Sequence, residues 1–212
     1  MSTRAPRKRL TAGERRETIL DAALSVFAER GFHGTSIDDI ARAAGISKAL
    51  IYEHFSSKEQ LHMSLLEQNA GELFERLAAA VAAVESAERL SAGLDAFFAF
   101  VEERRGAWRM LFRETADPDV AALMDRVVAQ VTAVVAALIA EDPGARKMGE
   151  DEAVRREAID MLAQMLVGAV QSLANWWADH QEVPRRRLLE LAMDFAWLGL
   201  ERLSRGERWT TR

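Results

Sequence analysis

The stretch Thr35–Lys58, TSIDDIARAAGISKALIYEHFSSK, predicts two short helices joined by a tight turn. Ser36, followed three residues later by Asp39, is close to the capping-box pattern that starts a helix. Apolar residues then recur at helical spacing until Gly45, which can leave a helix with a positive φ. Ser47 can cap a second helix. Helix-turn-helix units have this arrangement: a glycine makes the corner, and apolar positions on both helices lock the angle between them.

The second helix, residues 48–54, presents a set of side chains suited to a DNA groove. Lys48, Ala49, Tyr52 and His54 would all point outward. They offer one cation, one small residue for close approach and two polar-tipped rings that can reach phosphates or base edges. A buried helical hairpin can show a similar apolar pattern, but the caps and the outward polar residues together favour DNA binding.

These residues also resemble the signature of the TetR family of bacterial transcriptional regulators. The similar segments cover about residues 11–62 and are Gly31–Ala41, Ala44–Ser47, Tyr52–Phe55 and Ser57–Leu61. The recognition helix departs from the family pattern, because Ala49-Leu50 stands where a small pair such as Gly-Thr is common. The resemblance implies an all-helical homodimer with a small-molecule effector site in the C-terminal part.

Composition excludes several other classes of protein. Hydrophobic residues make up 49% of the 212 residues, and they are mostly Ala, Leu and Val at helical spacing, so a packed all-α protein is expected. No charge-free apolar run of about 18 residues appears, and no apolar stretch follows the basic N-terminus. We therefore expect no membrane span and no signal peptide. The absence of cysteine excludes disulfides and thiolate chemistry and fits a cytoplasmic protein.

The formal net charge of −5 is unevenly distributed along the chain. Residues 1–60 carry 10 Lys and Arg against 8 Asp and Glu, whereas residues 61–212 carry 18 against 25. The basic end therefore contains the helix-turn-helix, and the acidic remainder is expected to lie away from phosphates. The basic segment 1–10 is interpreted as an arm that contacts phosphates or a minor groove, or equally as a solvated tail.

Two further capping boxes are predicted to start long helices. Thr11 with Glu14 begins a helix that ends near Gly31, and Ser56 with Glu59 begins another that continues to about residue 85. Lys58 lies in the first turn of that second helix, where free N–H groups and the helix dipole favour an anion. We interpret Lys58 as a phosphate contact; the alternative is a simple surface lysine.

Further helices are expected at 89–105, 107–115, 119–140, 152–180 and 185–204, with a polar loop at 141–151, which gives about nine helices in all. The last two helices carry more apolar surface than one subunit can easily cover. Two copies could bury it in a four-helix interface, with Gly168 and Gly199 allowing close approach; the alternative is that both helices complete the monomer core. The predicted domains are a three-helix DNA-binding domain, 1–56, and an effector-binding and dimerisation domain, 57–212.

A ligand pocket in the second domain is a further hypothesis. Aromatic residues gather there, and a stripe on helix 152–180 offers hydrogen-bonding groups beside apolar walls, which is the usual composition of a pocket. The stripe could also be a polar part of the dimer interface, and the aromatic residues could simply fill the core. The candidate ligand contacts are Phe74, Phe98, Trp108, Phe112, Gln164, Gln171 and Asn175.

Catalytic and metal motifs are absent from the sequence. Glu59-x-x-His62 is only half of a di-iron signature, and no nucleophile or phosphate-binding glycine pattern occurs. We expect no enzyme activity, no metal and no cofactor.

The sequence predicts a regulator, most simply a repressor, that binds a palindromic double-stranded DNA operator as a homodimer and releases it on binding a small hydrophobic effector. The alternatives are a ligand-independent regulator or architectural factor, and a protein-interaction module whose helix-turn-helix is only structural. The residues predicted to contact DNA are Thr35, Ser36, Ser47, Lys48, Ala49, Leu50, Tyr52, His54 and Lys58.

Overall fold

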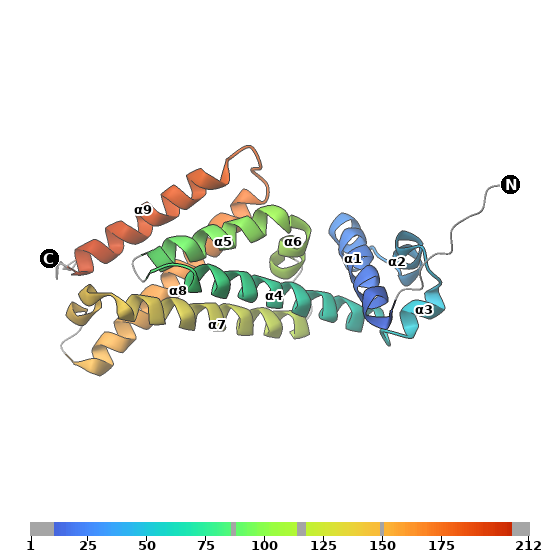
Figure 1. Ribbon diagram of the computed structural model, residues 1–212, viewed down its shortest axis with the longest axis horizontal. Helices are drawn as coiled ribbons and strands as arrows, with labels where there is room; N and C mark the ends of the chain where they lie inside the picture. Colours follow the sequence, from blue (N-terminus) through green and yellow to red (C-terminus); the bar gives the residue numbers. More distant parts are fainter. Residues whose placement is uncertain (1–10, 86–87, 114–117, 149–150, 205–212) are drawn as a thin grey trace. The chain divides into compact units, whose positions relative to one another are not determined.

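The computed structural model describes residues 11–85, 88–113, 118–148 and 151–204, and the side chains within these ranges except those of 110–113, 143 and 198–204. The described chain forms nine α-helices and one 3-10 helix, with no strand (Figure 1). The all-α prediction is confirmed. The predicted arm at 1–10 lies outside the described residues. The chain divides into two compact units, Met1–Gln68 and Asn69–Arg212.

The first unit holds α1 (Ala12–Arg30), α2 (Ile37–Ala44), α3 (Lys48–Tyr52) and the beginning of α4 (Lys58–Ala82). Both predicted capping boxes at the starts of α1 and α2 are present. The helices pack around a small apolar core, because each one turns its large aliphatic or aromatic residues inward. The fully buried side chains include Ile19, Leu20, Phe27, Ile40, Ile51, Leu61 and Leu66.

Two glycines shape the connections of this unit. Gly45 adopts the left-handed conformation at φ 64° and ends α2, as predicted. Gly34 is required for a different reason: a Cβ built there would lie 2.3 Å from the carbonyl oxygen of Arg30. The tight passage from α1 to α2 therefore admits only glycine at position 34 without movement of the backbone.

The second unit is formed by the rest of α4 together with α5 (Arg89–Glu103), α6 (Arg105–Arg113), α7 (Pro118–Glu141), α8 (Glu152–Trp177) and α9 (Arg185–Ser204). Within this unit α7 packs along α8, and α5 packs along α9 (Figure 1). Its core is built around Phe98, Phe100, Trp108 and Trp177, all of which are almost completely buried. Aromatic edges meet faces there, as between Phe98 and Trp177, whose ring centroids are 6.0 Å apart.

Three local predictions differ from the structure. Residues 143–147, expected in a loop, form a 3-10 helix, because Asp142 caps the amide of Gly144 and the following apolar side chains pack into a small cluster with Ile139 and Ile159. The break between α5 and α6 falls at Arg104 rather than Gly106. The cap of α4 is also shifted by one residue.

At the start of α4, Ser57 replaces Ser56 as the capping residue. The Ser57 hydroxyl accepts from the amide of Gln60, and the side chain of Gln60 accepts from the amide of Ser56. The helix start is therefore held by Ser57 and Gln60 and not by Ser56 and Glu59. Neighbouring serines and an adjacent Glu-Gln pair make the two registers nearly equivalent in sequence.

Helix α7 is long and apolar enough to cross a membrane by length and composition alone, as are some core helices of soluble proteins. In this chain five of its valines and Leu138 line a cavity of the second unit, which accounts for much of its apolar character.

Candidate DNA-binding surface and ligand pocket

Helix α3 is anchored by one buried residue and presents the rest of its surface. Ile51 is completely buried, while Lys48, Ala49 and Tyr52 are exposed and Leu50 is half-buried. Ser47 caps the helix through its hydroxyl, which accepts from the amide of Leu50 at 3.3 Å. The Tyr52 side chain is 48% exposed although it is a large ring in a short, well-packed unit. An exposed ring beside a cation is suited to contact with another molecule.

The cation of this surface has an intramolecular partner. Lys48 Nζ lies 3.0 Å from Asp38 Oδ2 on α2, and this hydrogen bond raises the pKa of the lysine. Both side chains are largely exposed, so the pair contributes little to stability. A DNA phosphate or base edge can therefore replace Asp38 at small cost while the pair holds the lysine extended.

Ser36 is engaged in the cap of α2. Its hydroxyl donates to Asp39 Oδ2 and accepts from the Asp39 amide at 3.2 Å. Asp39 Oδ1 also receives Arg30 at 3.3 Å and Arg42 at 3.1 Å. The bonds from Ser36 are the main cause of the lowered pKa of Asp39, and the two arginines add to it. The start of α2 is thus a fixed, ion-paired edge of the surface.

Lys58 and Thr35 hold the loop before α2. The Thr35 side chain is buried, and its hydroxyl donates to the carbonyl of Gly31 at 2.8 Å. Lys58 Nζ donates to the carbonyls of Phe32 at 2.9 Å and Thr35 at 3.0 Å, and it lies 4.1 Å from the centre of the Phe32 ring. Two of the three N–H donors of Lys58 are therefore used inside the unit. The sequence showed the lysine but not these partners.

His54 and His62 have different surroundings. His54 is half-buried at the end of the recognition segment, next to Phe55. His62 is buried, and its ring centre lies 5.1 Å from that of Phe27 and 4.7 Å from that of Phe32. The imidazole therefore packs in the aromatic core of this unit. No cluster of three or more residues able to hold a metal occurs in the described ranges.

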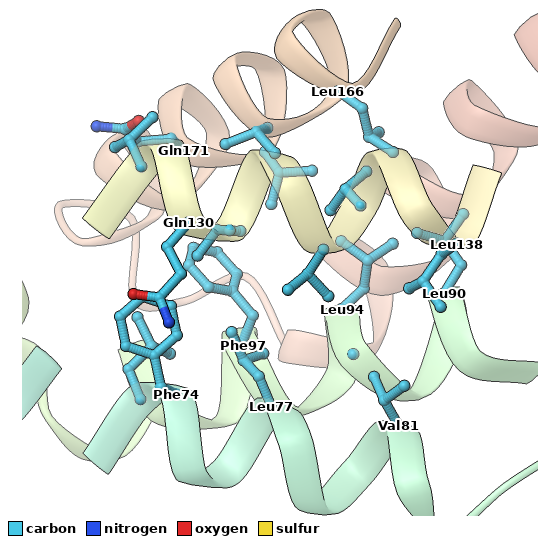
Figure 2. A pocket seen from close by; sticks show the side chains of 18 of the residues that line it. Phe74, Leu77, Val81, Leu90, Leu94, Phe97, Gln130, Leu138, Leu166 and Gln171 are labelled. Atoms are coloured by element: carbon cyan, nitrogen blue, oxygen red, sulfur yellow. The ribbon is translucent and has the colours of Figure 1, made fainter. Parts of the chain in front are cut away.

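The second unit contains an elongated, partly open cavity of about 300 Å³ between α4, α5, α7 and α8, with Trp108 of α6 in its wall (Figure 2). Three of the predicted ligand contacts, Phe74, Trp108 and Gln171, line it. The sequence analysis missed most of the residues in the cavity wall. The signal that could have revealed them is α7, whose apolar residues cover more of its circumference than one core-facing stripe requires. The residues missed include Val81, Leu90, Gly93, Val127, Val131, Val134, Val135, Leu138, Val167 and Val170.

The other predicted contacts lie elsewhere. Phe98 is buried in the core, and the side chain of Phe112 lies outside the described part. Asn175 Oδ1 accepts from Trp108 Nε1 at 3.0 Å, which fixes the indole in the cavity wall. Gln164 is exposed and lies before Leu166, the first α8 residue that lines the cavity. The predicted polar stripe therefore meets the cavity only in its later part, at Gln171, and at Asn175 through Trp108.

The two ends of the cavity differ in chemistry. Gln130 and Gln171 stand at one end with Phe74, while Val81, Leu90 and Leu138 stand at the other (Figure 2). Arg89 belongs to the second end, where its guanidinium binds Glu141 Oε2 at 2.8 Å. Gln130, Gln171 and Arg89 are the three strongly polar residues among the 22 described residues that line the cavity. The surface of the cavity is therefore mostly hydrocarbon.

Large apolar side chains are exposed on α8 and α9. They are Met161, Met165, Trp176, Leu191, Phe195 and Trp197, each 46 to 63% exposed. On α8 they recur at helical spacing on one face, which also contains the open position Gly168. A group of large exposed apolar side chains of this kind is typical of an interaction site.

Comparisons with known proteins agree on one family. The model of the bacterial regulatory proteins of the tetR family matches residues 19–63, and that of the tetracyclin repressor-like C-terminal domain matches residues 86–199. The HTH-type transcriptional activator FasR of Mycolicibacterium smegmatis is 32% identical over 195 residues, which cover 91% of this chain and 85% of FasR.

Solved structures show the same fold. A TetR-like transcriptional regulator from Rhodococcus sp. RHA1 superposes with a TM-score of 0.77 at 28% identity, covering 91% of this chain and 99% of that one. The regulator FadR from Bacillus subtilis, solved in complex with stearoyl-CoA, has a TM-score of 0.69 at 21% identity. The superposition covers 90% of this chain and 98% of the FadR chain.

Proposed function

Since the chain belongs to the TetR family of bacterial regulatory proteins and is a DNA-binding transcriptional regulator, we propose that it binds an operator as a homodimer and changes its DNA affinity when a hydrophobic effector enters the cavity of the second unit. The observation that carries this proposal is the apolar cavity, because a protein that only bound DNA would gain stability by filling it.

DNA recognition is assigned to α3. Lys48, Tyr52 and His54 would enter or flank the major groove, with Ala49 and Leu50 allowing close approach. Ser36 and Ser47 lie at the starts of α2 and α3, where helix N-termini favour phosphates. Two heads related by a two-fold axis would read half-sites about 34–36 Å apart, or a multiple of that distance.

Dimerisation is assigned to the exposed apolar faces of α8 and α9. Two copies of this pair would form a four-helix interface, with the open position at Gly168 permitting close helix approach. The functional division proposed is a DNA-binding part, 1–56, and an effector-binding and dimerisation part, 57–212, acting in the cytoplasm.

Helix α4 is the proposed connection between effector and operator. It begins with Lys58, which holds the loop before α2, and its later residues Leu73, Leu77 and Val81 line the cavity. A ligand that fits one position of α4 better than another shifts the population of DNA-competent dimers, by a coupling of about 1–3 kcal/mol in typical cases.

The test is binding of purified protein to DNA from upstream of its own gene, measured by fluorescence anisotropy at several salt concentrations against shuffled DNA. A large preference for the native fragment at two subunits per site supports the proposal, and weak equal binding to both fragments counts against it. Adding a hydrophobic ligand that is shown to bind must then change the operator affinity. An unchanged affinity would favour the ligand-independent alternative.

The direction of regulation is a separate question from DNA binding. The sequence favoured a repressor, whereas the FasR relative is named an activator. The sign depends on where the operator lies relative to the promoter, so transcription in vitro from the native promoter, with and without protein, is the measurement that assigns it.

A further inference from the structure

The shape of the cavity indicates which class of molecule fits it. On α4 its lining residues extend from Leu73 to Val81, a length of about 12 Å at 1.5 Å per residue. On α7 they extend from Val127 to Leu138, a length of about 16 Å. The cavity is therefore elongated along α4 and α7, and apolar side chains line it over almost its whole length. An elongated apolar space of this kind favours a linear hydrocarbon chain.

We propose that the cavity takes a single linear acyl chain, with its carbonyl head at the Gln130–Gln171 end and its methyl end against a wall made by the Arg89–Glu141 ion pair, so that this pair limits the chain length accepted. This inference rests on the proposed effector function and adds the ligand class, its orientation and a residue pair that sets specificity.

Charge decides the orientation. Among the described residues that line the cavity, Arg89 is the one cation, and Glu141 already neutralises it at 2.8 Å. Its Nε is enclosed and has no acceptor among the described residues, but the neighbouring carboxylate of Glu141 repels an anionic head at that end. The amides of Gln130 and Gln171 at the other end can donate to and accept from an uncharged ester, thioester or amide carbonyl.

The Arg89–Glu141 pair is positioned to act as an end wall. Arg89 opens α5 and Glu141 ends α7, so the ion pair ties together two helices that border the cavity. Leu90 and Leu138, next to this pair, complete the apolar side of the wall (Figure 2). With C–C bonds of about 1.5 Å projecting to ~1.25 Å along an extended chain, the cavity holds roughly 10 to 13 carbons before the methyl group meets the wall.

The glycine at position 93 gives a second, independent way to test the length limit. Gly93 lies in the cavity lining, and a Cβ built there would be in ordinary contact with the Val81 side chain at 3.5 Å. A leucine at 93 would therefore extend across the cavity and shorten it. Gly71 is its matched control, because it is a helical glycine on α4 with no atom within 4 Å of a built Cβ.

The experiment is titration calorimetry of the full-length protein with coenzyme A thioesters from octanoyl to stearoyl, with the matching free fatty acids. Affinity for the thioesters should rise by about fourfold for each added methylene until the cavity is full and then level off. R89A should move the levelling point to longer chains, G93L should move it to shorter chains, and G71L should leave it unchanged.

The outcomes separate this inference from the proposed function. If thioesters bind but neither R89A nor G93L moves the levelling point, the end wall is wrong and the effector site stands. If free acids bind more tightly than thioesters and R89A removes that binding, the orientation is reversed and the inference fails. Displacement of a bound thioester by a steroid would refute the linear class. If no chain of any length binds, the acyl class is refuted, and the effector function then depends on whether another hydrophobic ligand binds and changes the operator affinity.

Discussion

Replacing Lys58 with methionine tests whether this residue holds the loop or binds a phosphate. Methionine keeps an unbranched side chain of similar reach but removes the two donors that bind the carbonyls of Phe32 and Thr35 at 2.9 and 3.0 Å. Hydrogen bonds from charged groups contribute about 1.5–3 kcal/mol each when buried. Because Lys58 is only half-buried, we take the low end of that range for the two together.

The stacking of Lys58 Nζ on the Phe32 ring, at 4.1 Å, adds about 0.5–1 kcal/mol. K58M should therefore lower the free energy of unfolding by about 2–2.5 kcal/mol, measured by urea denaturation at fixed protein concentration. Lys48, with one exposed partner, provides the control: K48M should change stability by less than about 0.5 kcal/mol but weaken operator binding.

The salt dependence of DNA binding distinguishes the two roles of Lys58. If it serves the loop alone, K58M leaves the slope of log affinity against log salt unchanged. If its third N–H also neutralises a phosphate, the slope decreases by about one for each subunit. An unchanged unfolding free energy together with a reduced slope would refute the assignment of Lys58 to the loop.

Four further changes follow from the same contacts. G34A should destabilise the first unit by about 1–3 kcal/mol in urea denaturation, because its Cβ meets the Arg30 carbonyl, whereas G13A, with open space around it, should not. The stability contributed by the Asp39 carboxylate should be fully present above the ordinary pKa of aspartate and should be lost as the pH falls through the lowered pKa of Asp39. In D39N this loss of stability at acid pH should be absent, as measured by denaturation of both proteins across acid pH. F195D should weaken dimerisation by at least about tenfold in analytical ultracentrifugation, since Phe195 is an exposed apolar residue of α9. Val131→Phe should fill the cavity and weaken effector binding by calorimetry while leaving operator affinity in anisotropy unchanged.

The sequence alone determined the architecture of the first unit. Ser36 with Asp39, Gly45 and Ser47 act within a few residues of themselves, so the ends of α2 and the start of α3 follow from local chemistry. Where two local solutions were nearly equal, as at Ser56 and Ser57, the sequence could not choose between them. In the structure the hydroxyl of Ser57 accepts from the amide of Gln60, and the side chain of Gln60 accepts from the amide of Ser56, so Ser57 is the residue that caps α4.

Tertiary structure decided the contacts between residues far apart in the chain. Lys58 bonds to carbonyls more than 20 residues earlier, and Arg89 binds Glu141 across 52 residues. Gln164 and Gln171 share one predicted stripe, but only Gln171 reaches the cavity, because Gln164 lies about 10 Å away along the helix axis, beyond the last turn that borders the cavity. Helical periodicity therefore gives the faces of each helix, whereas the identity of the helix that covers each face, and the space left between them, arises only when the helices pack.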